Sequence, residues 1–109
     1  MPKYGDLLRM PQWQRKRLEI MDRDNFQCLM CDDNMNTLHV HHTVYIKDRL
    51  PWEYADETLM TVCDYCHDLC HWKKDKAQLK RLILRHKSNG VLNDNGVHHL
   101  FAEHGLAEV

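Results

Sequence analysis

Three short stretches carry the residues that decide the fold: Cys28-Leu29-Met30-Cys31, Leu38-His39-Val40-His41-His42, and Cys63-Asp64-Tyr65-Cys66-His67-Asp68-Leu69-Cys70-His71. The first and third each contain a Cys-x-x-Cys pair, and the second and third are rich in histidine. Thiolates and imidazoles are preferred ligands of zinc and related ions. The sequence therefore predicts two metal sites in this region, one that stabilises the fold and one that supports chemistry.

The length of the chain, 109 residues, suits one domain, and we assign 1–109 to it, with a core at 11–88 and a C-terminal tail at 89–109. So small a core benefits from an additional cross-link. The five cysteines are an odd number, the chain opens without the apolar run of a secretion signal, and no stretch approaches a membrane span. These features favour a cytoplasmic protein with metal-bound thiolates and no membrane partner.

The net charge of −1 conceals an uneven distribution of charge. Residues 1–23 and 73–87 are basic, and they flank an acidic segment at 24–72. This arrangement permits a nucleic-acid partner, but two solvated helix faces explain it equally well.

Two helices are expected outside the three stretches. Pro11 fits the first turn of a helix that ends near Asp24, with Leu18, Met21 and Trp13 at the spacing of one apolar face. A second apolar stripe lies within 74–86 and should stop at Asn89-Gly90, although the sequence does not decide whether this helix begins earlier, at the second Cys-x-x-Cys pair.

Residues 37–41 alternate as a β-strand does, which places His39 and His41 on one face. His42 then returns to the opposite face. Residues 43–46 are β-branched and aromatic, and they form either the returning strand or an extended loop.

The four cysteines of the two Cys-x-x-Cys pairs, Cys28, Cys31, Cys63 and Cys66, are the usual ligands of a tetrahedral structural zinc. The long gap between the pairs indicates an insert, and the insert carries the histidine pair at 41–42. Disulfides or buried free thiols are the alternatives. Cys70 is expected to be a buried small residue outside the metal site.

His67 and His71 are four residues apart, so on a helix starting near Cys63 or Cys66 they project from one face. Together with His41 they form a catalytic-type divalent site with an open position. A single zinc site of mixed Cys and His ligands is the rival interpretation, but neighbouring residues of a helix diverge by about a third of a turn, which fits two sites better.

His42 can stand near such an ion without binding it. An imidazole with an unperturbed pKa of about 6.5 suits the deprotonation of a water molecule for attack on phosphorus. A last short helix is expected at 97–106. Four other histidines in the C-terminal third of the chain are expected to be solvated surface groups: His86, His98, His99 and His104.

Taken together, these residues resemble the HNH endonucleases, whose core is the ββα-metal, or His-Me, finger, and many of which are phage or prophage proteins. The resemblance covers roughly Trp13 to His71. It rests on Trp13, Arg17, Arg23-Asp24, the Cys28/Cys31 pair, Leu38-x-Val40-His41-His42, Tyr45, Pro51-Trp52-Glu53-Tyr54-x-Asp56 and Cys63-x-x-Cys66-His67-x-x-x-His71. It implies a small α+β fold, a ββα-metal finger with flanking helices, clamped by the four-cysteine zinc site.

The resemblance also implies metal-dependent hydrolysis of DNA phosphodiester bonds, by nicking or double-strand cleavage. His42 would be the general base, and His41, His67 and His71 would bind the catalytic ion, which is Mg²⁺, Mn²⁺, Ni²⁺ or Zn²⁺. Thr58 stands near the position of a family Asn that holds the loop and orients the base. We expect its hydroxyl to make a shorter hydrogen bond in that place.

The DNA, expected to be double-stranded, would contact the strand-loop after the histidine pair and the lysines beyond the metal-binding helix. The residues expected there are Tyr45, Lys47, Arg49, Lys73 and Lys74. Solvated lysines are an equally good explanation of the last two.

Two other functions stay open. One is a non-catalytic zinc module with a degenerate HNH site that binds nucleic acid or a protein and has lost turnover through Thr58. The other is an accessory factor in a larger phage or host DNA-processing complex. The histidine set favours the enzyme, because a binding module does not need a base beside an open metal site.

Overall fold

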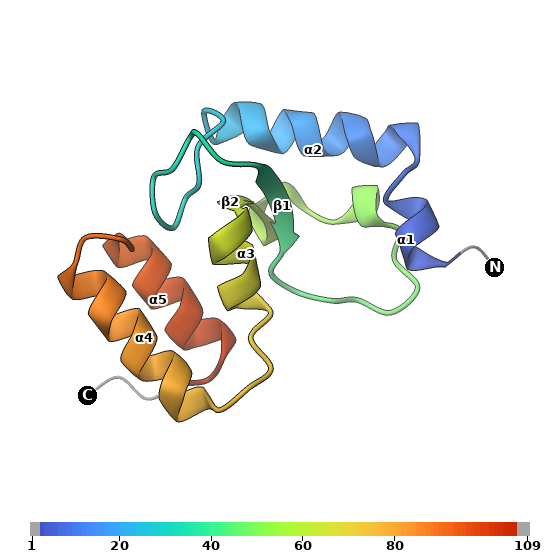
Figure 1. Ribbon diagram of the computed structural model, residues 1–109. Helices are drawn as coiled ribbons and strands as arrows, with labels where there is room; N and C mark the ends of the chain where they lie inside the picture. Colours follow the sequence, from blue (N-terminus) through green and yellow to red (C-terminus); the bar gives the residue numbers. More distant parts are fainter. Residues whose placement is uncertain (1–2, 107–109) are drawn as a thin grey trace.

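Two antiparallel strands and the helix that follows them form the centre of the molecule (Figure 1). The computed structural model describes residues 3–106. Strand β1 (Leu38–His42) pairs with β2 (Leu59–Cys63), and α3 (Asp64–Cys70) begins directly after β2. The predicted α+β class is thus confirmed, with a two-stranded sheet.

The returning strand is β2, and residues 43–46 belong to the loop before it. That loop contains two short 3₁₀ helices, Pro51–Glu53 and Asp56–Thr58. It is closed at its base by Thr43, whose backbone N–H donates to the Thr58 carbonyl at 2.8 Å.

Helix α2 (Pro11–Arg23) packs against the sheet, after the short helix α1 (Tyr4–Leu7) (Figure 1). The predicted start and end of α2 are confirmed, and Trp13 and Met21 are buried as expected. The placement of Leu18 on the same apolar face is wrong, since Leu18 is 53% exposed. Ile20, two residues further on and about 200° around the helix, is buried instead. The buried face of α2 covers the side of the sheet that carries Val40.

Helices α4 (Lys76–Ser88) and α5 (Asp94–Glu103) lie side by side at the other end of the molecule (Figure 1). Helix α3 ends at Cys70, so it does not continue into α4. Leu100 and Phe101 of α5 are buried in the same cluster as the cysteines. The packed core therefore extends into the segment that was expected to be a tail.

Helix α5 begins three residues earlier than the predicted range of 97–106, because Asn93 caps it: the Asn93 side chain accepts a hydrogen bond from the Gly96 backbone N–H at 2.7 Å. The same side chain donates to the Leu29 carbonyl at 3.0 Å, and so does Asn95, at 3.1 Å. The first turn of α5 is thus attached to the backbone of the first Cys-x-x-Cys turn.

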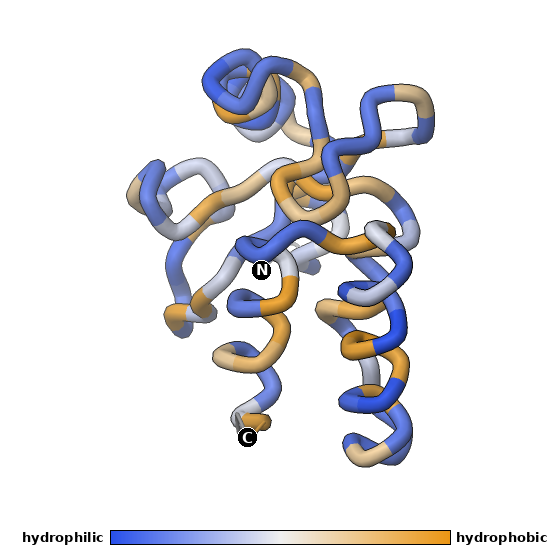
Figure 2. The backbone as a smooth tube through the Cα atoms, turned by 90° about the vertical axis from the view of Figure 1, so that its left-hand side faces the viewer, coloured by the Kyte–Doolittle hydropathy of each residue, from blue (hydrophilic) through white to orange (hydrophobic). Residues whose placement is uncertain are grey.

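No helix within residues 3–106 has both the length and the apolar character that crossing a membrane requires. The longest helices have 13 residues, and Figure 2 shows hydrophilic residues among the hydrophobic ones along them.

Gly96 permits the close approach of α5 to this turn, and its replacement by Ala tests the contact. A Cβ at Gly96 would lie 2.5 Å from the Met30 carbonyl oxygen, a backbone atom that cannot rotate away. We expect Gly96→Ala to lower the free energy of unfolding by about 1–3 kcal/mol, as measured by urea denaturation.

Gly5→Ala is the matched control, because a Cβ at helical Gly5 meets no atom within 4 Å. It should be neutral or slightly stabilising, as Ala is a better helix former than Gly. Equal stabilities of the Gly96 variant and the wild type would contradict the close docking of α5.

Candidate functional site

The four cysteines of the two Cys-x-x-Cys pairs meet in one place. Their Sγ atoms all lie within 4.8 Å of one another, and those of Cys31 and Cys63 are 3.6 Å apart. A tetrahedron built on Zn–S bonds of about 2.3 Å has sulfur–sulfur edges of about 3.8 Å. The group can therefore hold a metal ion such as zinc, and all five cysteines are free thiols rather than disulfides.

Each pair is shaped by backbone groups that point at sulfur. The N–H of Met30 lies 3.4 Å from Cys28 Sγ. The N–H of Cys66 lies 3.5 Å from Cys63 Sγ, so the Cys63 side chain also caps α3. A hydrogen bond between the side chains of Cys66 and Cys28 lowers the pKa of Cys28 to about 5 and raises the pKa of Cys66. Negative charge is thus favoured on Cys28, whereas burial raises the pKa of Cys31 to about 12. Metal binding requires the thiols to lose their protons.

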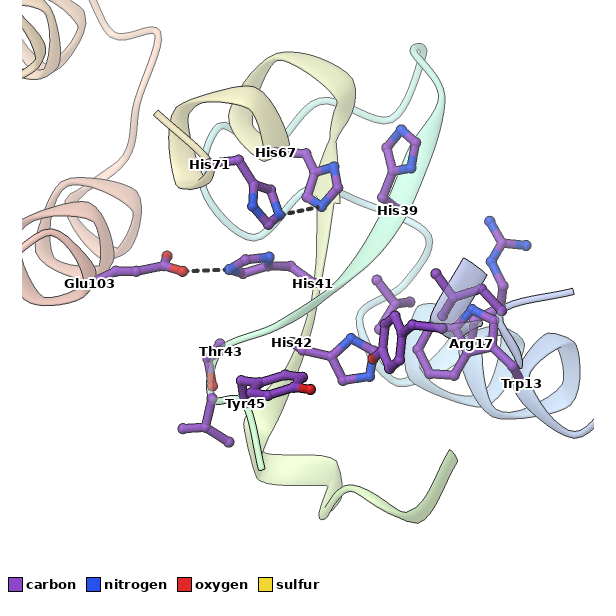
Figure 3. A pocket seen from close by; sticks show the side chains of 14 residues that line it. Trp13, Arg17, His39, His41, His42, Thr43, Tyr45, His67, His71 and Glu103 are labelled. Atoms are coloured by element: carbon purple, nitrogen blue, oxygen red, sulfur yellow. Dashed lines mark hydrogen bonds and ion pairs between the residues drawn. The ribbon is translucent and has the colours of Figure 1, made fainter. Parts of the chain in front are cut away.

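The three histidines expected to bind a second ion also come together. One ligand atom each of His41, His67 and His71 falls within a group no wider than 4.8 Å, and the Nε2 atoms of His67 and His71 are 3.1 Å apart. His41 comes from β1 and is only 3% exposed, whereas the other two come from α3 and its C-terminal cap. Figure 3 shows the rings of His67 and His71 above that of His41.

His67 and His71 are held in the neutral form that binds metal ions. Burial, followed by the neighbouring histidines, lowers the pKa of His67 to about 4. Burial and His41 also lower the pKa of His71. A nitrogen-only donor set suits a borderline divalent ion such as Zn²⁺, Ni²⁺ or Mn²⁺.

His42 lies on the opposite face of β1 from His41, as the alternation along a strand requires. Its ring stacks on Trp13, with centroids 4.9 Å apart, and meets Tyr54 edge-on at 4.7 Å. Its Nε2 is 3.3 Å from the Pro51 carbonyl oxygen. Burial lowers the pKa of His42, so the ring is a neutral base with a fixed orientation.

A cleft of about 510 Å³ connects the ring of His42 with the group formed by His41, His67 and His71. His41, His42, His67 and His71 all line it, and Arg17 of α2 adds a cationic side chain at its wall (Figure 3). The strand therefore presents a candidate base and a candidate metal site to the same space.

Thr58 makes its hydrogen bonds within the loop before β2 and at the base of that loop. Its hydroxyl donates to the Ala55 carbonyl within its own turn, at 2.7 Å. Its carbonyl accepts hydrogen bonds from the N–H and the hydroxyl of Thr43, at 2.8 and 2.9 Å. Thr58 thus holds the loop next to His42, while the ring itself contacts the carbonyl of Pro51.

The residues expected at DNA are placed on two sides of the histidine cluster. Tyr45 lines the cleft and is 76% exposed, and Lys47 is exposed in the same loop. Arg49 lies over the ring of Tyr54, 5.9 Å from its centroid. Lys73 and Lys74 are exposed just after α3, where the Lys74 ammonium lies 5.8 Å from the centroid of Trp72.

Sequence reasoning missed two residues of α5. Glu103 Oε1 lies 2.7 Å from His41 Nε2 (Figure 3). His99 Nε2 lies 2.6 Å from Glu103 Oε2. His99 is therefore not the solvated residue that was expected. The spacing of four residues between His99 and Glu103 is visible in the sequence, but their position beside β1 depends on how α5 docks.

Comparisons with protein-family models, with curated proteins and with solved structures gave no match.

Removal of the metal from the four-cysteine group should unfold the chain, because the group joins segments far apart in sequence. Zinc sites of this kind contribute on the order of 10 kcal/mol to small domains. We expect a strong chelator to abolish the cooperative thermal transition seen by circular dichroism, and added Zn²⁺ to restore it. Mg²⁺ should not, because it avoids thiolate ligands.

Cys66→Ser should reproduce the effect of the chelator without any chelator present. A chelator-treated protein that is free of zinc, as shown by elemental analysis, and still melts at the original temperature would contradict this role.

Proposed function

We propose that this protein is a metal-dependent endonuclease of the HNH type, which hydrolyses phosphodiester bonds in DNA. The observation that carries the proposal is the position of His42 and His41 on opposite faces of β1 but in one cleft. A base next to a separate group of metal ligands is the arrangement that hydrolysis of a phosphodiester needs.

His42 is the proposed general base. Trp13 and Tyr54 hold its ring, and burial keeps it unprotonated at neutral pH. It can take a proton from a water molecule that enters the cleft and direct the resulting hydroxide to phosphorus. The carbonyl of Pro51 and the loop closed by Thr58 keep the ring in position.

His41, His67 and His71 fit a divalent ion by the number and chemistry of their donor atoms. Such an ion, when bound, would stabilise the negative charge that develops on the phosphate and on the leaving 3′ oxygen. The three residues orient one another: His41 lies edge-on to both other rings, at centroid distances of 5.5 and 5.2 Å.

Positive side chains in the cleft and on the segments next to the histidine-bearing elements support a polyanionic substrate. Arg17 lines the cleft, Lys47 stands in the loop after β1, and Lys73 and Lys74 follow α3. Exposed Tyr45 offers a flat ring in the cleft. These groups fit the sugar–phosphate backbone, and we therefore propose duplex DNA bound with little sequence preference.

A plasmid-nicking assay tests the reaction and the base together. The protein, with its tightly held zinc retained, is assayed with Mg²⁺, Mn²⁺, Ni²⁺ or Zn²⁺. We expect nicking with at least one ion, and a loss of at least about a hundredfold in His42→Ala, since general-base catalysis contributes that much.

His86→Ala is the matched control, because His86 is a histidine of α4 that pairs with Tyr65, away from the cleft. It should cleave at the wild-type rate. A wild-type protein that is folded, holds zinc and is inert with all four ions would refute the proposal. A His42 variant of unchanged rate would refute the assignment of the base.

The salt dependence of DNA binding tests the proposed phosphate contacts. In the His42→Ala background, which binds without cleaving, Lys47→Ala should weaken duplex binding and lower the slope of log K against log [salt] by about 1. Fluorescence anisotropy of a labelled duplex measures both quantities.

Lys87→Ala, at the exposed C-terminal end of α4, serves as the control and should leave the slope unchanged. Identical slopes for the Lys47 variant and the control would remove Lys47 from the interface.

A further inference from the structure

Helix α5 brings a second set of ligand atoms to His41. Cys70 of α3 and His99 and Glu103 of α5 each offer one donor atom, and these atoms and one of His41 all lie within 4.8 Å of one another. This group is separate from the four cysteines, and it extends away from His67 and His71: Glu103 meets His41 on the side facing α5 (Figure 3).

The group is buried at His41 and Cys70 and opens toward the cleft at Glu103. His41 is 3% exposed and Cys70 5%, and the side chains of His99 and Glu103 are 18% and 20% exposed. Polar and charged groups in such a place are costly unless they are paired or bind a metal ion. The carboxylate of Glu103 lies between the two imidazoles, with one oxygen toward each.

Glu103 holds both imidazoles of the group. Its Oε1 lies 2.7 Å from His41 Nε2, and its Oε2 lies 2.6 Å from His99 Nε2. These contacts gather the donor atoms in one place, where a divalent ion can take the two imidazoles and the carboxylate as ligands.

The position of α5 is determined by other contacts, so the group does not depend on the carboxylate to assemble. Asn93 and Asn95 attach the start of the helix to the Leu29 carbonyl. At the other end, His104 Nε2 lies 2.8 Å from the Leu69 carbonyl oxygen of α3. Between these two attachments His99 and Glu103 share one face of the helix, four residues apart.

We propose that His41, Cys70, His99 and Glu103 form a second metal site for a zinc-like divalent ion. Two imidazoles, one thiolate and one carboxylate are all zinc ligands, and four ligands make the closed tetrahedral site that is typical of structural zinc. The ion would join α5 to β1 and α3. This proposal does not depend on nuclease activity.

The two histidine groups share the ring of His41. His41 Nε2 is the atom that faces Glu103. A neutral imidazole has one lone pair on nitrogen, so it can bind one ion at a time. An ion in the closed group therefore withdraws His41 from His67 and His71.

Cobalt spectroscopy tests the site directly, because Co²⁺ bound to a thiolate gives a charge-transfer band in the near ultraviolet that nitrogen and oxygen ligands do not give. Co²⁺ is titrated into the full chain with its four-cysteine zinc retained, as elemental analysis of the same sample shows. We expect the band to grow to one equivalent in the wild type and to be lost in Cys70→Ser.

Three further variants separate this site from its neighbour. His99→Ala and Glu103→Gln should each weaken Co²⁺ binding by more than about tenfold, a loss that even an outer-shell partner of a metal ligand can cause. The double variant His67→Ala with His71→Ala should keep the thiolate band, because neither residue belongs to the group.

Cobalt that binds to the wild type without a thiolate band overturns the proposal, and this result needs no variant that could misfold. A band that persists in Cys70→Ser overturns it as well, since the thiolate would then belong to the four-cysteine group. Glu103 would in either case be only the ion-pair partner of His41 and His99. This experiment measures cobalt binding and not DNA cleavage. Its result is therefore independent of the nicking assay, which tests the nuclease proposal.

Discussion

The meeting of two Cys-x-x-Cys pairs is the constraint on which the rest of the structure depends. Cys28 and Cys31 belong to a turn after α2, whereas Cys63 ends β2 and Cys66 lies in the first turn of α3. A metal ion held between the pairs would fix the start of α3 against the sheet, and thereby the direction of His67. The first Cys-x-x-Cys turn also receives the start of α5 through Asn93 and Asn95. One cluster of sulfur atoms therefore positions both helices that face His41.

The two-residue period of β1 divides the chemistry between two faces of one strand. His41 points to α3 and α5, where other imidazoles and Glu103 surround it. His42, the next residue, points to α2 and stacks on Trp13. The proposed base and the proposed metal ligand can stand this close only because a strand turns successive side chains apart. On a helix, neighbouring residues would diverge by only about a third of a turn.

Local signals in the sequence were sufficient for much of this arrangement. The Cys-x-x-Cys spacing, the alternation that ends in His41 and His42, and the four-residue step to His71 each depend on residues close together in the chain. The docking of α5 was not predictable, because it depends on the caps and contacts of Asn93 with a turn more than sixty residues away. For the same reason Glu103 escaped attention: a carboxylate on a helix is ordinary until the fold places it beside a buried imidazole. The sequence placed Leu18 wrongly because its spacing from other apolar residues is compatible with two helix faces. In the folded protein the buried face is the one that carries Ile20.

The central claim is that a metal ion bound only by sulfur organises the fold, and X-ray absorption at the zinc edge measures this most directly. The protein is loaded to one zinc per chain, so that the tightest site dominates the signal. We predict a first shell of four sulfur atoms at about 2.3 Å, as in other tetrathiolate sites. A first shell that contains nitrogen or oxygen, or a folded chain that retains no zinc, would contradict the account. In that case the positions of α3 and α5 would need another cause.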